Sequence, residues 1–181
     1  MSLSLKLRQM LVSIFLLLFL LPSSFIAIDR AFYTQLLTST EQKMEVHMYA
    51  ILSELSVTED KVELLNNALA PDFYRPDSGL SAYITHEQEL VWQSDSSLNQ
   101  HFIPPIEALP PGEHLFRQTT QPSGTFWVLS ISLLFDAEEY TRPLTVHVVQ
   151  TDERLIAPQQ TFRATLIQWF IGIGLMLLLL M

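Results

Sequence analysis

The sequence predicts an α+β domain held between two transmembrane helices, and three features of its 181 residues indicate this fold class. Two long apolar runs lie near the ends of the chain, over residues 10–28 and 166–181. Between them comes first a stretch whose apolar residues recur at helical spacing. Several segments of alternating apolar and polar residues follow, and this alternation is typical of half-buried strands.

The first apolar run, residues 10–28, follows Lys6 and Arg8 and contains Pro22. Its nineteen residues are long enough for a membrane span, and basic residues ahead of a span favour a cytoplasmic N-terminus. The sequence SSFIAIDRA that closes the run is a poor cleavage site, so we expect an uncleaved anchor and no removed signal peptide. Residues 1–9 are then cytoplasmic, and residues 29–165 lie outside, in the periplasm of a cell with two membranes.

The second apolar run, residues 166–181, contains one polar side chain, Gln168. As a helix it would be about 24 Å long, short of the roughly 30 Å of hydrocarbon that a span must cross. No basic or polar tail follows Met181. We therefore expect the chain to be a fragment that ends inside an incomplete second transmembrane helix.

The segment between the runs is strongly acidic. All 19 acidic residues lie between Asp29 and Glu153, whereas only 8 of the basic residues lie between Asp29 and Thr165. Such a charge balance argues against a nucleic-acid partner, because phosphate binding needs basic residues. The absence of cysteine excludes a disulfide framework, a lipid-modified cysteine and a cysteine-ligated metal.

Residues 29–55 contain neither proline nor glycine and are predicted to form one helix that continues out of the first span. An apolar stripe runs along this helix at steps of three, four and seven. We expect the stripe to pack on the domain's own sheet or to pair with a second copy of the chain. Other faces of the helix carry Leu36, Val46, Tyr49 and Leu52, which would offer a second surface. The candidate dimer interface is the stripe Leu37, Met44, Met48, Ile51 and Leu55.

A second, short helix is predicted over residues 58–70, with Thr58 as its N-cap and Pro71 ending it. Strands follow. Residues 80–86 and 89–94 read as a hairpin, and residues 95–112, with two Pro-Pro pairs, as a loop with room for one helical turn. Three antiparallel strands are predicted over residues 113–120, 124–135 and 143–150.

The fourth of these five strands has one apolar and one partly polar face. Trp127, Leu129 and Ile131 alternate with Val128 and Ser130 along it. The order and size of the elements suit the PAS-like sensor domains of membrane receptors. We therefore expect residues 29–165 to form an extracytoplasmic PAS-like domain.

Three segments, LSAYITHEQELVWQSD, PLTVHVVQTD and WFI, resemble the sensory region of PhoQ-type membrane sensor histidine kinases. The resemblance covers most of the chain and implies a PDC-type PAS-like domain in a homodimer anchored in the lipid bilayer of the inner membrane. It also implies that this chain senses a signal for a two-component system. The missing cytoplasmic part would hold the phosphorylated histidine, bind ATP and magnesium, and contact the cognate response regulator.

Two other functions fit the same layout. One is a two-span adaptor or assembly protein that binds a partner outside the cytoplasm. The other is the sensor of a chemoreceptor or a nucleotide cyclase. The sequence that follows Met181 in the gene would distinguish these possibilities.

No catalytic motif occurs in residues 1–181, so no catalytic residues are assigned. The histidines show no metal-ligand spacing and are expected to be surface or ordinary structural residues, with His147 on the less buried face of the sheet. PAS-like sheets often bind small ligands on one face. The candidate ligand-binding residues are Arg75, Tyr83, Arg117, Trp127 and Ser130.

The resemblance implies divalent cations as the signal, because PhoQ-type sensors carry a dense acidic patch beside the membrane. The corresponding segment here offers only Glu107 and Glu113. A denser cluster, Asp136, Glu138 and Glu139, falls in a hairpin that we expect to be far from the membrane. These five carboxylates are the candidate metal ligands, and we expect millimolar magnesium or calcium not to control the protein.

Overall fold

The computed structural model describes residues 5–58, 61–65, 69–87, 89–100, 102–104, 109–137 and 140–179. The chain divides into two compact units. One consists of Met1–Leu37 with Ile156–Met181, and the other of Thr38–Leu155. The first unit is helical, and the second contains the two sheets that the described residues form.

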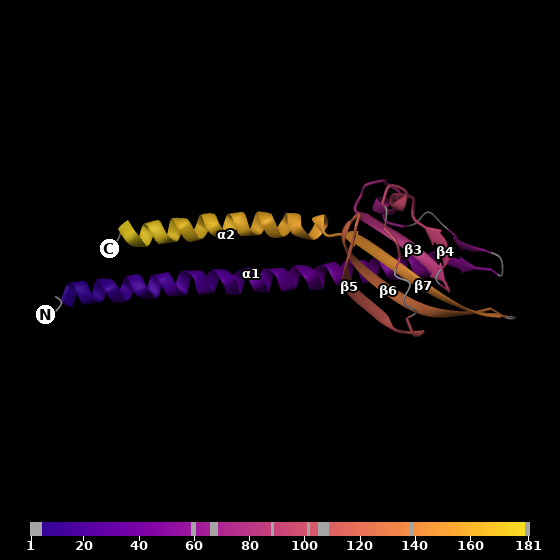
Figure 1. Cartoon of the computed structure of the whole chain (residues 1–181), viewed down its shortest axis with the longest axis horizontal. Helices are drawn as coiled ribbons and strands as arrows, with labels where there is room; N and C mark the ends of the chain where they lie inside the picture. Colours follow the sequence, from indigo (N-terminus) through magenta and orange to yellow (C-terminus); the bar gives the residue numbers. More distant parts are fainter. Residues whose placement is uncertain are drawn as a thin grey trace. The chain divides into compact units, whose positions relative to one another are not determined.

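Two helices, α1 (Leu5–Glu54) and α2 (Glu153–Leu179), supply the helical unit, where they lie side by side and run in opposite directions (Figure 1). The rings of Phe32 and Phe162 stack with their centroids 3.9 Å apart. The Arg163 guanidinium donates two hydrogen bonds to the Asp29 carboxylate, at 2.6 and 2.7 Å. Pro22 lies inside α1 without ending it. Among the described residues, neither helix offers a stretch that is both long and apolar enough to cross a membrane.

The helix predicted over residues 29–55 is confirmed as the C-terminal half of α1, but the helix predicted over residues 58–70 is wrong. The chain instead forms a two-stranded hairpin of β1 (Leu55–Val57) and β2 (Val62–Leu64). Thr58 closes the turn, with its N–H and hydroxyl both donating to the carbonyl of Lys61, at 2.9 and 3.0 Å. A short helix is marginal by itself, and the burial of Val62 in the domain favours the strand.

The predicted five strands form one antiparallel sheet in the order β4-β3-β7-β6-β5, which confirms the α+β class. Two 3-10 turns flank the hairpin of β3 and β4, and the second is the helical turn expected in the proline-rich segment. These elements are η1 (Pro71–Phe73), β3 (Leu80–His86), β4 (Glu89–Gln93), η2 (Asp95–Ser97), β5 (His114–Gln121), β6 (Gly124–Ala137) and β7 (Tyr140–Thr151).

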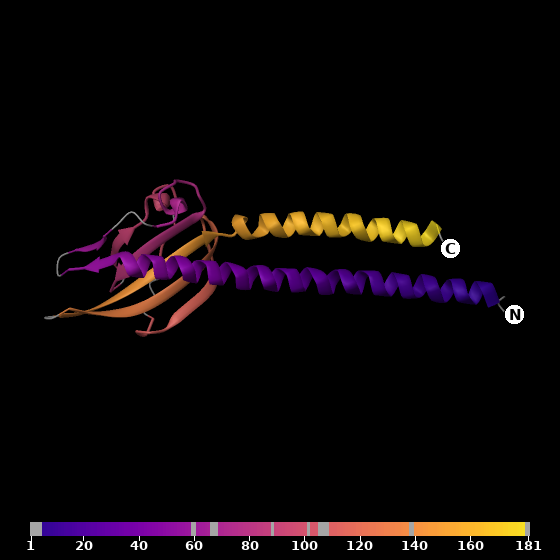
Figure 2. The same ribbon diagram turned by 180° about the vertical axis from the view of Figure 1, so that it is seen from behind.

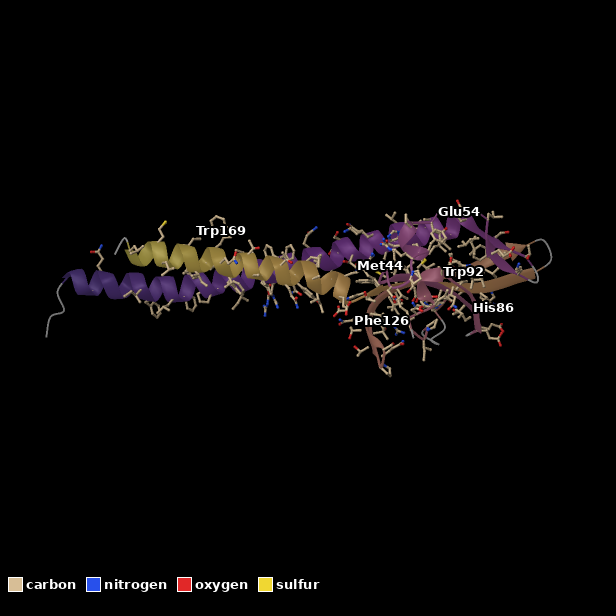
Figure 3. All side chains as sticks on the ribbon, turned by 90° about the horizontal axis from the view of Figure 1, so that it is seen from above. Met44, Glu54, His86, Trp92, Phe126 and Trp169 are labelled. Atoms are coloured by element: carbon tan, nitrogen blue, oxygen red, sulfur yellow. The ribbon has the colours of Figure 1, made fainter. Side chains whose placement is uncertain are left out.

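One face of the sheet is aliphatic and is covered by the end of α1. The C-terminal part of this helix crosses that face (Figure 2), and its side chains, Met44 among them, meet those of the sheet (Figure 3). The sheet contributes a fully buried layer. Its members are Leu80, Ala82, Ile84, Leu129, Leu144, Val146 and Val148.

The apolar stripe of α1 is core, which corrects its assignment as a dimer interface. Met44, Met48 and Ile51 are 0–1% exposed within the single chain, so no side-chain surface remains for a second copy to cover. Leu37 and Leu55 are half-buried, and Leu55 begins β1. The exposed side chains of this segment lie on other faces of the helix and include Val46 and Tyr49.

The opposite face of the sheet is polar yet equally buried. Register pairs Tyr83 with His147 and His147 with Ser130, so these three side chains share one face. An apolar cluster of Tyr83, Phe102, Phe126, Val128 and Val149 covers one part of it. The expectation that His147 lies on a less buried face is wrong, because its side chain is 1% exposed.

Candidate functional site

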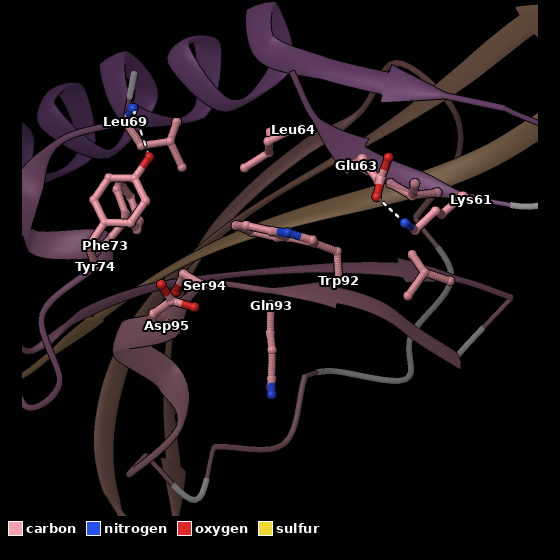
Figure 4. A pocket seen from close by; sticks show the side chains of 12 residues that line it. Lys61, Glu63, Leu64, Leu69, Phe73, Tyr74, Trp92, Gln93, Ser94 and Asp95 are labelled. Atoms are coloured by element: carbon pink, nitrogen blue, oxygen red, sulfur yellow. Dashed lines mark hydrogen bonds and ion pairs between the residues drawn. The ribbon is translucent and has the colours of Figure 1, made fainter. Parts of the chain in front are cut away.

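A cavity of about 610 Å³ lies between the β1–β2 hairpin, η1 and the edge strand β4 (Figure 4). We call it the Trp92 groove. Its size falls within the range of small-ligand sites, about 300–1,000 Å³. The lining residues are Lys61, Val62, Glu63, Leu64, Leu69, Phe73, Tyr74, Val91, Trp92, Gln93, Ser94 and Asp95.

The indole of Trp92 lies at the centre of the groove (Figure 4). Trp92 pairs with Ile84 of β3, and a register shift after this pair leaves Val91 as an extra residue in β4. Such a bulge re-aims the neighbouring side chains at a sheet edge. Leu69 and Phe73, which are 6% and 1% exposed, provide the apolar wall opposite.

The two ends of the groove are polar and differ in charge. Lys61 and Glu63 form an ion pair at the hairpin end. At the other end, the Leu69 N–H donates to the Tyr74 hydroxyl at 3.3 Å, and Asp95 is exposed at the start of η2. Among the described residues, no basic side chain pairs with Asp95.

His147 anchors a buried network on the polar sheet face. Its Nδ1 lies 2.7 Å from the Ser130 hydroxyl, and its Nε2 lies 3.1 Å from the Thr85 hydroxyl, which donates to the Thr145 carbonyl. This arrangement suits a neutral imidazole that donates from Nε2 and accepts at Nδ1. Burial is the main cause, and the positive charge of Arg117 a smaller one, of a pKa for His147 that is lowered from 6.5 to about 4.

Tyr83 is the polar side chain of this face whose hydroxyl lacks a partner. Its side chain is 2% exposed, and among the described residues its Oη makes no hydrogen bond. The nearby hydroxyls of Ser81 and Ser97 donate elsewhere, to Gln100 and to the Ser94 carbonyl, both at 2.6 Å. Burial is the largest cause of a raised pKa for the Tyr83 phenol.

The junction between β7 and α2 is tied to the domain at several points. The Asp152 N–H donates to the Thr125 carbonyl at 3.0 Å, and the Trp127 indole donates to the Asp152 carboxylate at 2.7 Å. Arg154, in the first turn of α2, forms an ion pair with Asp72 of η1 at 2.5 Å. This hydrogen bond from Arg154 is the largest cause of a lowered pKa for Asp72.

Gly79 completes the junction on the other side of β7. Its φ of +77° is a conformation that favours glycine, and its carbonyl accepts from the Thr151 N–H at 2.9 Å. A Cβ at this position would lie 2.6 Å from the Thr151 hydroxyl oxygen. The backbone just before β3 therefore lies so close to the end of β7 that only glycine fits at this position.

The structure brings together three of the five residues predicted to bind a ligand. Tyr83, Arg117 and Ser130 share the polar face of the sheet. Trp127 points to the aliphatic face, since it is one residue out of phase with Val128. Arg75 lies in the loop after η1, largely exposed, where it forms an ion pair with Asp72.

The predicted metal ligands do not form a site within the described part of the chain. Glu113 is exposed just before β5. Glu107, Glu138 and Glu139 lie outside the described residues, as does the side chain of Asp136. In the part of the chain that the structure describes, no group of three or more His, Asp or Glu residues is placed to hold a metal ion.

The sequence did not predict the Trp92 groove, the hydrogen bond between Trp127 and Asp152, or the ion pair between Arg154 and Asp72. A lone tryptophan near the end of a predicted strand was a weak signal for the groove. Asp72 and Arg154 are 82 residues apart, so no local pattern connects them. Searches against protein-family models, curated proteins and solved structures found no match to this chain.

Proposed function

We propose that this chain is the signal-sensing and transmembrane-signalling region of a two-component sensor histidine kinase. In this proposal, α1 and α2 anchor the chain in the inner membrane, and the PAS-like, PDC-type domain lies in the periplasm as part of a homodimer. The sheet order and the antiparallel pairing are compatible with a PAS-like fold. The acidic middle segment suits an exported domain.

The observation that carries the proposal is the junction of β7 and α2. One residue, Asp152, separates the central strand of the sheet from the helix, and it is hydrogen-bonded to β6 on both its backbone and its side chain. Arg154 adds a tie to η1. A change in either sheet face that moves β7 must therefore also move the first turn of α2.

Signalling then needs two packed states of the domain whose populations a ligand or a partner protein shifts. Movement of α2 along or about its axis would carry the change toward the membrane, as helix shifts do in other switching proteins. The pair of Asp29 and Arg163 and the stacked rings of Phe32 and Phe162 would keep α1 and α2 in register.

The catalytic steps belong to the cytoplasmic part that the proposal places after Met181. That part would bind ATP and magnesium, phosphorylate its own histidine and pass the phosphoryl group to a response regulator. We expect residues 1–181 alone neither to bind ATP nor to become phosphorylated.

Topology and gene sequence test the proposal. Reporter fusions after Leu55 and after Gln150 should both report an exported location, and a cytoplasmic signal at either site would contradict it. The gene should continue after Met181 into a histidine-bearing helix and an ATP-binding module. A stop codon within a few residues would favour an adaptor or assembly protein, and a different output module would favour a chemoreceptor or cyclase.

A further inference from the structure

The Trp92 groove has an apolar centre that the described residues leave open. Trp92 is half-buried, whereas Leu69 and Phe73 behind it are buried. An aromatic ring with open space beside it can stack on another ring or receive a cation on its face. The cavity of about 610 Å³ leaves room for a ligand of several dozen atoms at most.

The charges of the groove select the kind of ligand. Lys61 is already paired with Glu63 at one end, which leaves Asp95 as the unpaired charge among the described lining residues. An anionic ligand would be repelled by Asp95 and by the acidic domain as a whole. A protonated amine would instead gain a charge-assisted hydrogen bond from the Asp95 carboxylate.

We propose that the Trp92 groove binds a small organic cation that has an aromatic or apolar body and a protonated amine. The body lies against Trp92 and the wall of Leu69 and Phe73. The ammonium group donates to Asp95, and the hydroxyl of Tyr74 lies at the same end of the groove (Figure 4).

The groove is connected to α2 through η1. Phe73 and Tyr74 line the groove, and the preceding residue, Asp72, forms the ion pair with Arg154 in the first turn of α2. A ligand that shifts η1 therefore displaces the partner of Arg154. This connection to signalling rests on the proposed function, whereas the binding itself does not.

Phenethylamine is a suitable probe, because it has one aromatic ring and one amine. Titrated into the whole chain in detergent and followed by calorimetry, it should bind saturably, while 3-phenylpropionate, which replaces the amine with a carboxylate, should not bind. Asp95→Asn should weaken phenethylamine binding about tenfold, since a charge-assisted hydrogen bond is lost. Glu113→Gln removes the same charge from an exposed site outside the groove and should leave the affinity unchanged.

Trp92→Phe keeps an aromatic side chain and should weaken binding less than Trp92→Ala. Equal affinity of wild type and Asp95→Asn for phenethylamine, or equal binding of phenethylamine and 3-phenylpropionate, would overturn the proposal. Folding of the three groove variants, Asp95→Asn, Trp92→Phe and Trp92→Ala, can be checked by the unchanged fluorescence of the buried Trp127.

The link to signalling is measured separately, in a chimera that joins residues 1–181 to the cytoplasmic part of a characterised sensor kinase. Phenethylamine should change autophosphorylation of the chimera, and Asp95→Asn should shift that response to about tenfold higher concentration. Saturable binding without any change in phosphorylation would support the site and contradict its connection to the output.

Discussion

Acid should destabilise the domain through His147. The neutral imidazole is held between Ser130 and Thr85, is 1% exposed, and has a folded-state pKa of about 4 against 6.5 in the unfolded chain. Between pH 6.5 and about pH 4, His147 therefore binds a proton in the unfolded chain but not in the folded domain. The stabilisation is fully present above about pH 6.5 and is lost progressively as the pH falls toward 4.

The size of the effect follows from the pKa difference. Over the roughly 1.5 pH units between pH 6.5 and pH 5, His147 is protonated in the unfolded chain but not in the folded domain. Each pH unit lowers the free energy of unfolding by roughly 1.4 kcal/mol, so the loss between pH 7 and pH 5 is about 2 kcal/mol. At pH 4 the loss reaches about 3 kcal/mol, a large part of the stability of a small domain. The pKa of His47 is also lowered by burial, but this side chain is half-exposed and should contribute less.

The assay is urea unfolding of the whole chain in detergent at pH 7 and pH 5, followed by tryptophan fluorescence. His147→Gln should be less stable than wild type at pH 7, because an amide replaces the two-sided imidazole network. Its loss of stability between pH 7 and pH 5 should, however, be about 2 kcal/mol smaller than that of wild type. His47→Gln serves as the matched control and should keep most of the wild-type pH dependence. The same acid loss in wild type and His147→Gln would refute the reasoning.

Three further predictions concern the core, the helical pair and the junction. Met44→Glu with Met48→Glu should unfold the domain, because two buried carboxylates cost more than about 5 kcal/mol together, as seen by circular dichroism. Phe32→Cys with Phe162→Cys should cross-link within one chain on mild oxidation, since the two rings stack at 3.9 Å, and a gel shift would detect it. Trp127→Phe should lower the free energy of unfolding by about 2 kcal/mol, because a hydrogen bond to a carboxylate is lost.

Each of these has a control in the same chain. Val46→Glu with Tyr49→Glu changes exposed positions of the same helix and should leave the domain folded; unfolding by both pairs alike would contradict the assignment of the stripe to the core. Ala31→Cys with Ala164→Cys places thiols at exposed positions and should stay reduced. Phe116→Leu alters the ring stacked on Trp127 without touching Asp152, so an equal or larger effect would show that stacking outweighs the hydrogen bond.

The sequence predicted the sheet well because its strands carry local signals. Alternation along residues 124–135 and the polar turn after His86 mark strands whatever the rest of the chain does. The hairpin after Leu55 was predicted as a helix, because Thr58 resembles an N-cap while the burial of Val62 becomes visible only in three dimensions. Tertiary packing decided the conformation there.

The candidate sites depended on contacts between distant parts of the chain. The sequence grouped Tyr83, Arg117, Trp127 and Ser130 as lining of one ligand site, but register places Trp127 on the opposite face from the other three. The polarity of that face suggested exposure, yet His147 is buried because hydroxyls satisfy both of its nitrogens. No sequence pattern predicts the hydrogen-bond network around His147, since its members come from three strands.

The central claim is that the junction of β7 and α2 transmits the state of the domain, and Asp72 allows a direct test because two arginines pair with it. Arg154 lies in α2, whereas Arg75 lies in the loop after η1. In the kinase chimera, autophosphorylation in membrane vesicles is measured for wild type, Arg154→Gln and Arg75→Gln. The account predicts that Arg154→Gln changes the phosphorylation level severalfold while Arg75→Gln leaves it near that of wild type. Equal levels in all three proteins would contradict it.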